Sequence, residues 1–278
     1  MLDCMRYAFS TSPQRTTWPW LIEVWKRADD LAVFESGWTF DHFYPLFGDS
    51  TEDCLDGWIT LTALLQETSR VRGGVLVSGM VYRHPGLLAN MATTLDITSG
   101  GRLELGIGAG WNQEECDAYG IELGTMRERF DRFEEGLAVI DSLLTNDRTT
   151  FHGEYFQLVD AMSNPKPVQA RLPLCIGGRG PKRTMPLVAR YANHWNYSGA
   201  DPVEFQSCLA IVRAECERIG RNPAEISPSW LARYTGDNAA FRSEIAAFEA
   251  AGAELSIVSL PKSSPPSVVN DVAEAIAS

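Results

Sequence analysis

The sequence predicts an α/β protein of the (β/α)8, or TIM, barrel class, folded as one domain over residues 1–278 with insertion loops. Short apolar segments alternate with longer amphipathic segments along the chain, and they number eight of each. The length of 278 residues is close to the roughly 250 that such a barrel needs. Strict alternation implies parallel strands joined by right-handed crossovers. A doubly wound open sheet is the alternative, and the count and the length favour the closed barrel.

The first half of the chain holds four predicted strand–helix pairs. Residues 103–109 are nearly all apolar, which is typical of a strand buried on both faces of a parallel sheet. Pro85 suits the first turn of a helix, and Gly100 and Gly101 suit its end because glycine readily adopts the left-handed conformation. The strands are expected at 5–10, 38–40, 74–81 and 103–109, and the helices at 21–33, 56–69, 84–99 and 130–144.

The second half repeats the pattern after two longer connections. Residues 111–126 read as a loop, and residues 149–173 contain a short hairpin at 151–156 followed by a proline-rich run. Loops of this length in a compact protein often serve the functional site. The strands are expected at 174–176, 194–197, 229–234 and 255–260, and the helices at 181–191, 202–219, 238–251 and 266–277.

Composition favours a cytoplasmic enzyme over a nucleic-acid-binding or membrane protein. The net charge of −12 repels phosphate backbones. No apolar run reaches the roughly 18 residues that span a bilayer, and no signal peptide is visible at the start. The six cysteines form no Cys-x-x-Cys pair, and scattered cysteines of this kind suit reduced, packed thiols. They are Cys4, Cys54, Cys116, Cys175, Cys208 and Cys216.

A glycine-rich run ends the predicted fourth strand, where a barrel builds its active face. Residues 106–112 read Gly-Ile-Gly-Ala-Gly-Trp-Asn, and Trp111 stands where a dinucleotide fingerprint needs glycine. Glycine at alternate positions lets a flat ring lie close to the backbone, because no Cβ intervenes. The alternative interpretation is that small residues merely fit a tapering barrel end.

A second glycine run follows the predicted fifth strand and leads into a helix. Gly177, Gly178 and Gly180 surround Arg179, and Lys182 and Arg183 follow. Free N–H groups at a helix start attract anions, and phosphate is the usual guest. The alternative is a solvated basic turn.

An Asp41-His42 pair lies among aromatic residues at the end of the predicted second strand. Imidazole exchanges protons near neutral pH, so His42 is the candidate catalytic residue and Asp41 the residue expected to orient it. His84 is expected to cap a helix, and His194 to lie near the opposite end of the barrel. The adjacent pairs Glu114-Glu115 and Glu134-Glu135 are expected to be solvated.

Other chemistries find less support. Four separated histidines give no zinc signature, so no metal site is predicted, and neither a phosphate loop of the Gly-x-x-x-x-Gly-Lys type nor a Gly-x-Ser-x-Gly turn occurs. A phosphate-binding aldolase or isomerase barrel would need a strand-end lysine or glutamate, which the predicted strands do not offer in an obvious place.

The blocks at 77–85 (VSGMVYRHP) and 95–112 (LDITSGGRLELGIGAGWN) resemble the luciferase-like monooxygenase superfamily, and within it the oxidoreductases that use the deazaflavin coenzyme F420. The resemblance extends from about residue 7 to residue 260. The sequence departs from the family at residues 33–35, where Val-Phe-Glu replaces the usual Gly-Phe-Asp, and the segments after the last two strands are short.

The resemblance implies a luciferase-like barrel with the cofactor ring at the ends of strands two to four. It places a bulge with a non-proline cis peptide near Val77-Ser78-Gly79 beneath the ring, and the cofactor phosphate at the second glycine run. It also places Asp41 and His42 beside the redox centre. The cofactor-binding residues so implied are Val77, Ser78, Gly79, Gly108, Ala109, Gly110, Trp111, Gly177, Gly178, Arg179, Gly180 and Lys182.

The function expected is hydride transfer between coenzyme F420 and a small organic substrate, in a protein that is a homodimer by family analogy. One alternative is an FMN-dependent monooxygenase that uses reduced flavin and O2. Another is a barrel that binds the flavin or deazaflavin without catalysis, which the short C-terminal loops suggest.

Overall fold

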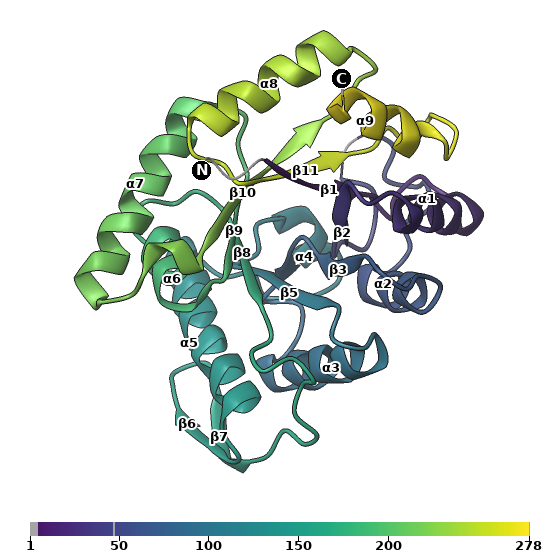
Figure 1. Cartoon of the computed structure of the whole chain (residues 1–278). Coiled ribbons are helices and arrows are strands. Elements are labelled where there is room, and N and C mark those ends of the chain that lie inside the picture. The colour runs from purple at the N-terminus through teal and green to yellow at the C-terminus, as the bar shows by residue number, and fades with distance from the viewer. Residues whose placement is uncertain (1–4, 47, 278) are drawn as a thin grey trace.

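The computed structural model describes residues 5–46 and 48–277, which form a closed parallel barrel surrounded by helices (Figure 1). The barrel strands pair in the order β3-β2-β1-β11-β10-β9-β8-β5-β4, and a β3–β5 pairing closes the ring. The short strands β3 and β4 share one position, so the nine strands of this sheet fill eight positions. The closed (β/α)8 barrel predicted from the sequence is thus confirmed.

The barrel strands follow the predicted order with small shifts of their ends. The strand expected at 38–40 begins earlier, because Phe34 already pairs with Tyr7. The strands are β1 (Arg6–Ser10), β2 (Phe34–Thr39), β3 (Arg72–Val75), β4 (Ser78–Gly79), β5 (Leu103–Gly108), β8 (Leu174–Gly177), β9 (His194–Tyr197), β10 (Ser227–Arg233) and β11 (Leu255–Ser259).

Helices follow the strands around the outside of the ring. Several begin at a capping side chain, as Asp56 shows by accepting a hydrogen bond from the amide of Ile59 at 2.7 Å. His84 caps its helix as predicted, accepting from the amide of Gly86 at 3.1 Å. The helices are α1 (Trp18–Asp30), α2 (Gly57–Gln66), α3 (Pro85–Thr98), α5 (Met126–Thr145), α6 (Thr184–Tyr191), α7 (Pro202–Ile219), α8 (Asn238–Ala250) and α9 (Val268–Ala277), with the 3-10 turn η1 (Pro223–Glu225).

Three predicted segments differ in the structure. The strand expected at 74–81 is interrupted between β3 and β4, where the Leu76–Val77 peptide bond is cis. The loop expected at 111–126 contains the helix α4 (Gln113–Ala118). The helix expected from residue 181 begins at Thr184.

The predicted hairpin exists and is longer than expected, with antiparallel strands β6 (Thr149–His152) and β7 (Gln157–Ala161). Its turn is held by the carboxylate of Glu135 on α5, which accepts hydrogen bonds from the amides of Glu154, Tyr155 and Phe156 at 2.7–3.1 Å. The prediction that Glu135 is solvated was therefore wrong. The contact satisfies both partners, because the carboxylate gains donors and each amide of the turn gains an acceptor.

Aromatic side chains fill the layer between the barrel and its helices. Trp195 stacks on Phe205, with ring centroids 5.1 Å apart, and Trp230 stacks on Phe248 at 4.5 Å. Each pair joins a barrel strand to a covering helix, and burial of one such ring contributes about 1.5–3 kcal/mol. The described cysteines, Cys54, Cys116, Cys175, Cys208 and Cys216, are free thiols, and Cys4 lies outside the described residues.

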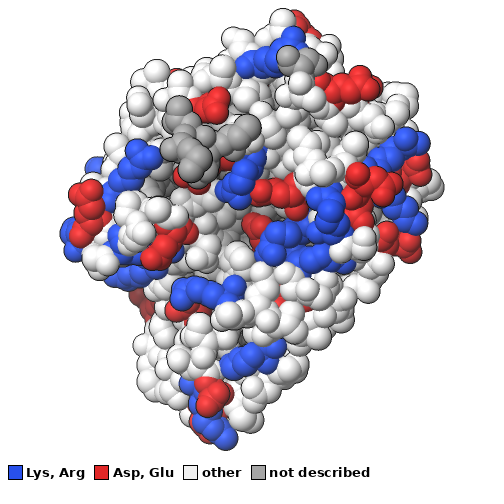
Figure 2. Space-filling model, viewed as in Figure 1, with Lys and Arg blue, Asp and Glu red and all other residues white. Residues whose placement is uncertain are grey.

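Charged residues at the surface and at the strand starts are largely paired. Figure 2 shows basic and acidic side chains interspersed over the visible face. Arg6 bonds Glu35 at 3.1 Å, so the Glu35 that departs from the usual family residue links β2 to β1. None of the described helices combines the length and the apolar composition that crossing a bilayer requires.

A buried ionic network lies inside the barrel near the starts of β5, β9 and β10. Glu104 bonds Arg72 at 2.9 Å and lies 3.4 Å from Nδ1 of His194, whose Nε2 is 2.6 Å from Oγ of Ser229. Burial works to raise the pKa of Glu104, but His194 and Arg72 outweigh it and lower the pKa to about 2. Burial works to lower the pKa of His194, but Cys175 and Glu104 outweigh it and raise the pKa to about 10. His194 therefore lies in the barrel interior near the starts of the strands, which is the end of the barrel where the sequence predicted it.

This network predicts a loss of stability in acid. The pKa of Glu104 is lower in the folded chain than its model value of 4.5. Its contribution to the free energy of unfolding is therefore complete above about pH 4.5 and falls as the pH drops toward 2. We expect Glu104→Gln to flatten this acid slope in urea titrations between pH 2 and 5. The exposed Glu249→Gln is the matched control, and an unchanged slope in Glu104→Gln would contradict the assignment.

Candidate functional site

A buried carboxylate organises the loops at the carboxyl ends of the strands. Glu115 on α4 is 0 % exposed and accepts three hydrogen bonds. They come from Nδ1–H of His42 at 2.7 Å, the amide of Phe43 at 2.6 Å and the hydroxyl of Tyr82 at 2.6 Å. The loop after β2, the loop after β4 and α4 thus meet at one carboxylate.

The local sequence explains why Glu115 points inward. Asn112 caps α4, and its side chain accepts a hydrogen bond from the amide of Glu115 at 3.3 Å. Glu114 faces solvent, while Glu115 is buried on the opposite side of this short helix. The prediction that both glutamates are solvated was wrong for Glu115. The Asn-x-x-Glu spacing, which is typical of a helix start, was the signal that could have located α4 and its inward-facing residue.

The charge state of this cluster follows from its hydrogen bonds. Burial works to raise the pKa of Glu115, but the bonds from His42, Phe43 and Tyr82 outweigh it and lower the pKa. Burial and the neighbouring Glu115 together raise the pKa of Tyr82 well above its usual value. Glu115 is therefore anionic and Tyr82 a neutral donor. Since a carboxylate only accepts, the Nδ1 of His42 carries the hydrogen, which leaves Nε2 available for proton exchange.

His42 occupies the position expected of it, at the mouth of the barrel. Its side chain is 10 % exposed, and its ring lies 5.7 Å from the ring of Trp111 and 5.2 Å from that of Phe40. Trp111 itself is 57 % exposed. The imidazole is thus held among aromatic rings, with an indole beside it that is open to a ligand.

Asp41 does not orient His42, contrary to the sequence-based expectation. Its buried carboxylate is held by Arg83, which bonds it through both terminal nitrogens, one of them 3.1 Å from Oδ1. Arg83 also lies 3.5 Å from Asp56, the residue that caps α2. Burial raises the pKa of Asp41, and Arg83 opposes this. Asp41 therefore fixes the loops after β2 and β4 to each other, and Glu115 takes the role that adjacency suggested for Asp41.

The bulge between β3 and β4 forms the floor beside this cluster. The cis peptide lies between Leu76 and Val77, next to the position near Val77-Ser78-Gly79 that the family resemblance implied. Oγ of Ser78 accepts a hydrogen bond from the indole of Trp58 at 2.7 Å. Gly79 lies against the ring of Tyr82, since a Cβ there would be 2.9 Å from that ring. The bulge is thus joined to α2 on one side and to the Glu115 cluster on the other.

Glycines at the ends of β5 and β8 make room for this bulge, and we call Gly108 and Gly177 the rim glycines. A Cβ on Gly108 would lie 2.8 Å from the Val77 side chain, and one on Gly177 would lie 3.1 Å from it. A Cβ on Gly106 would lie 1.9 Å from the backbone oxygen of Val75. These glycines thus leave room for the Val77 side chain, and their contact with a flat ring stays a prediction.

The remaining residues of the first glycine run turn the chain away from β5. Gly110 has a φ of +86°, a conformation that favours glycine, and its carbonyl accepts a hydrogen bond from Arg129 at 3.0 Å. Ala109 packs against the core from a half-buried position. The run thus places Trp111 at the mouth of the barrel, beside His42.

The second glycine run forms a turn whose cations are partly neutralised. Gly178 has a φ of +129°, and its amide bonds the carbonyl of Asn196 at 3.0 Å. Arg179 pairs with Glu204 at 2.7 Å, and Arg183 pairs with Asp131 at 2.6 Å. Carboxylates of the chain itself thus offset two of the three cations, and phosphate binding at this turn stays a prediction.

One cation of the turn keeps no such partner. Lys182 makes no ion pair within residues 5–46 and 48–277, and the amides of Arg179 and Gly180 meet no acceptor there. Lys182 and these amides are the groups of the turn available to a phosphate.

These features share one end of the barrel. Val77 touches glycines of both β5 and β8, so the bulge lies between the His42 cluster and the phosphate-binding candidate. Among the described residues, no group of three or more His, Cys, Asp or Glu side chains is arranged to hold a metal ion. The arrangement offers free amides and Lys182 at the turn, which can accept an anion, and an imidazole with one unbonded ring nitrogen, which can exchange a proton.

Comparison with known proteins gives a family match over most of the chain. A family model described as luciferase-like monooxygenase matches residues 5–266. An F420-dependent glucose-6-phosphate dehydrogenase of Amycolatopsis mediterranei is 34 % identical over 175 residues, which are 62 % of this chain and 50 % of that protein. The chain spans about half the length of the first curated relatives that it matches.

Solved structures show the same fold. An F420-dependent secondary alcohol dehydrogenase, in complex with an F420–acetone adduct, superposes with a TM-score of 0.89 over 98 % of both chains at 21 % identity. The monooxygenase RslO1 of Streptomyces bottropensis superposes with a TM-score of 0.81 at 18 % identity, over 98 % of this chain and 97 % of its own.

The seating of Val77 predicts a specific coupling between two residues. Gly108→Ala places a methyl group against the Val77 side chain, and we expect it to lower the free energy of unfolding by about 1–3 kcal/mol. Val77→Ala makes room, so the loss caused by Gly108→Ala should shrink in that background. The free energies of unfolding of the four proteins in this double-mutant cycle, measured in urea, give the coupling.

Gly73→Ala is the matched control, because its methyl group meets the side chains of Leu61 and Leu65, which Val77→Ala does not change. Equal losses from Gly108→Ala in both backgrounds would contradict the contact.

Proposed function

The chain belongs to the luciferase-like monooxygenase family, and on that premise we propose that it is a coenzyme F420-dependent oxidoreductase that transfers a hydride between the deazaflavin and a small organic substrate. The observation that carries the proposal is the His42–Glu115 pair, a polarised imidazole at the barrel mouth beside the Val77 bulge. The relatives named F420-dependent dehydrogenases support the choice of cofactor.

The residues present fit such a cofactor at two places. The bulge at Val77-Ser78-Gly79 offers a floor for a planar ring, because it is seated in the rim glycines and tied to α2. The amides of Arg179 and Gly180, with Lys182, would hold the phosphate at the start of α6. When bound, the deazaflavin supplies the two-electron donor or acceptor, which no protein side chain can provide.

His42 would handle the proton that accompanies the hydride. For a substrate oxidised at a hydroxyl-bearing carbon, the hydrogen on that carbon would leave with both electrons of the C–H bond, the cofactor being the acceptor, and the hydroxyl proton would go to Nε2 of His42. Glu115 stabilises the imidazolium that results, because its carboxylate lies 2.7 Å from Nδ1. In the reverse direction the same nitrogen returns the proton to the carbonyl oxygen. Trp111 and Phe40 limit the access of water around the ring.

An FMN-dependent monooxygenase is the second candidate. FMN also presents a tricyclic ring and a phosphate, and the structure shares its fold with a monooxygenase. Binding therefore separates the two candidates more directly than geometry does.

We predict that the chain binds coenzyme F420 and binds FMN at least about tenfold more weakly, a difference of about 1.4 kcal/mol. Tryptophan fluorescence of the purified protein, titrated with each cofactor, measures both affinities. Trp111 should report the binding because its indole is exposed at the mouth, whereas Trp38 is buried beside His194. Trp111→Phe should remove most of the quench. Tight FMN binding without F420 binding would overturn the cofactor assignment.

We predict that His42→Ala lowers kcat by about 10²- to 10⁴-fold while cofactor affinity changes little, because proton transfer contributes on that scale. Glu115→Gln should lower kcat by about 10²-fold, since a neutral amide cannot stabilise the imidazolium at His42. Steady-state kinetics with a panel of alcohols and carbonyl compounds, at several pH values, provides the measurement.

Glu114→Gln is the matched control, because Glu114 is the exposed neighbour on the same helix and should leave kcat unchanged. Full activity in His42→Ala would remove His42 from the mechanism, and no turnover by the unmodified protein would favour a barrel that binds without catalysis.

A further inference from the structure

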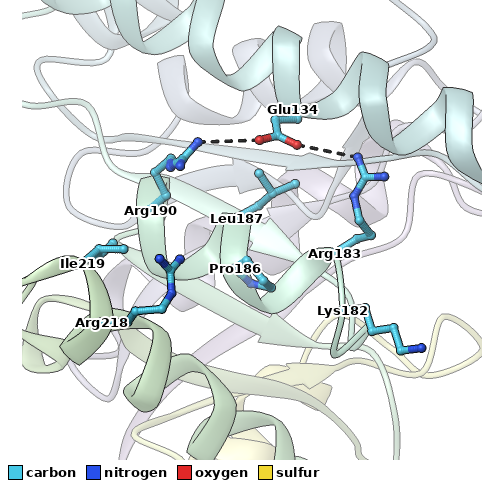
Figure 3. Close-up of a pocket in the computed structure, with 8 residues that line it drawn as sticks. All are labelled: Glu134, Lys182, Arg183, Pro186, Leu187, Arg190, Arg218 and Ile219. Atoms are coloured by element: carbon cyan, nitrogen blue, oxygen red, sulfur yellow. Dashed lines mark ion pairs between the residues drawn. The ribbon is translucent and has the colours of Figure 1, made fainter.

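A second recess lies on the outer side of the barrel, over α6. Its volume is about 200 Å³, and it is bounded by α5 on one side and by the end of α7 on the other (Figure 3). α6 has 8 residues, whereas α5 has 20 and α7 has 18, so the short helix forms the floor between two longer walls. Pro186 and Leu187 line that floor. The recess is smaller than the roughly 300–1,000 Å³ of a site for a whole cofactor, so it suits part of a larger molecule.

The side chains around this recess are mostly cationic. Lys182, Arg183, Arg190 and Arg218 line it, and Glu134 is the single acidic side chain among the lining residues. We call this recess the basic groove and define it by these four cations. Such a concentration of cations is unusual in a chain of net charge −12.

Glu134 only partly neutralises the groove. Its carboxylate lies between Arg183 and Arg190, 3.6 Å from each guanidinium, which is longer than a hydrogen bond (Figure 3). No other ion pair of Arg190 occurs in the described part of the chain. Arg190 therefore keeps donors for a further acceptor.

The other cations differ in how far they are engaged. Arg183 and Arg218 also pair with Asp131 and Glu215, at 2.6 and 2.7 Å, and the guanidinium of Arg218 is 64 % exposed. A guanidinium has five N–H donors, so one carboxylate does not saturate it. Lys182 makes no ion pair in residues 5–46 and 48–277, as noted above for the turn.

The groove is continuous with the turn proposed to hold the cofactor phosphate. Lys182 belongs to both features, and Arg183 follows it directly at the start of α6. From Lys182 the groove runs along α6 to Arg190, about 12 Å at the helical rise of 1.5 Å per residue. A chain that continued from the phosphate along this path would pass Lys182, Arg183 and Arg190 in turn.

We propose that the basic groove binds a carboxylate-rich chain that extends from the cofactor phosphate. Guanidinium groups recognise carboxylates through paired hydrogen bonds, and carboxylates spaced along a flexible chain match cations spaced along α6. Coenzyme F420 continues beyond its phosphate as an oligoglutamate, whereas FMN ends at its phosphate. The groove thus provides a reason, independent of the ring site, for a deazaflavin rather than a flavin. This inference rests on the proposed function, because it takes the cofactor phosphate to lie at residues 178–182.

The test compares cofactors with and without the anionic chain. The probes are F420 with its oligoglutamate, the phosphate-bearing F420 core without glutamates, and FMN. In the unmodified protein we expect the oligoglutamate form to bind about 5- to 10-fold more tightly than the core at low salt, as two or three exposed ion pairs would give. This advantage should diminish as salt is raised.

Arg190→Gln with Arg218→Gln should abolish the advantage of the oligoglutamate form and leave affinity for the core unchanged. Arg27→Gln with Arg242→Gln, two exposed arginines on α1 and α8, is the charge-matched control and should retain the advantage. Equal affinities for the two F420 forms in the unmodified protein would overturn the proposal, and so would the same loss of advantage in the control variant.

A failure of the proposed function would look different. If neither F420 form binds, the ring site is wrong, and a free tetraglutamate peptide then tests the groove by itself in equilibrium dialysis. Peptide binding that disappears in the double variant would support the groove, and an absence of peptide binding would overturn it.

Discussion

The functional end of this barrel depends on one constraint: a fully buried carboxylate has to receive hydrogen bonds. Glu115 meets this requirement with donors from three segments that are distant in sequence, at His42, Phe43 and Tyr82. An unpaired buried charge would cost several kcal/mol, so the loops after β2 and β4 cannot move independently of α4. The same bonds that remove this cost also fix the tautomer of His42. Stability and the chemistry of the site therefore arise from the same contacts.

A second constraint, that of space, places the floor of the site. Val77 occupies room that only glycine at positions 108 and 177 leaves free, so β5 and β8 shape the bulge as much as β3 and β4 do. The glycines at these two positions therefore leave room for the connection between β3 and β4. The turn proposed to bind phosphate begins one residue after Gly177. The same packing therefore fixes the position of this turn relative to the Val77 bulge.

Sequence reasoning located the elements of the site better than it located their partners. The alternation of strands and helices gave the barrel, and strand-end positions made His42 and the glycine turn the candidates, because in a parallel barrel these ends share one face. Adjacency suggested Asp41 as the partner of His42, but the Asp41 carboxylate bonds Arg83, which is 42 residues away in sequence. Glu115 was missed because its burial depends on a six-residue helix inside what read as a loop. The partners of Arg179 and Arg183 come from α7 and α5, and no local pattern encodes such long-range ion pairs.

Two glutamate–histidine pairs lie at opposite ends of the barrel, and their differences separate structure from chemistry. His194 uses both ring nitrogens, with Glu104 at Nδ1 and Ser229 at Nε2, inside a closed interior. No proton can leave such an imidazole without breaking the network that stabilises the fold. His42 uses only Nδ1, and its Nε2 makes no hydrogen bond within the described residues. The same residue types therefore stabilise the barrel at one end and leave an unbonded ring nitrogen at the other. The decisive difference is that Nε2 of His42 is unbonded. This difference arises from the way the loops close around Glu115, so the presence of a Glu and a His in the sequence does not reveal it.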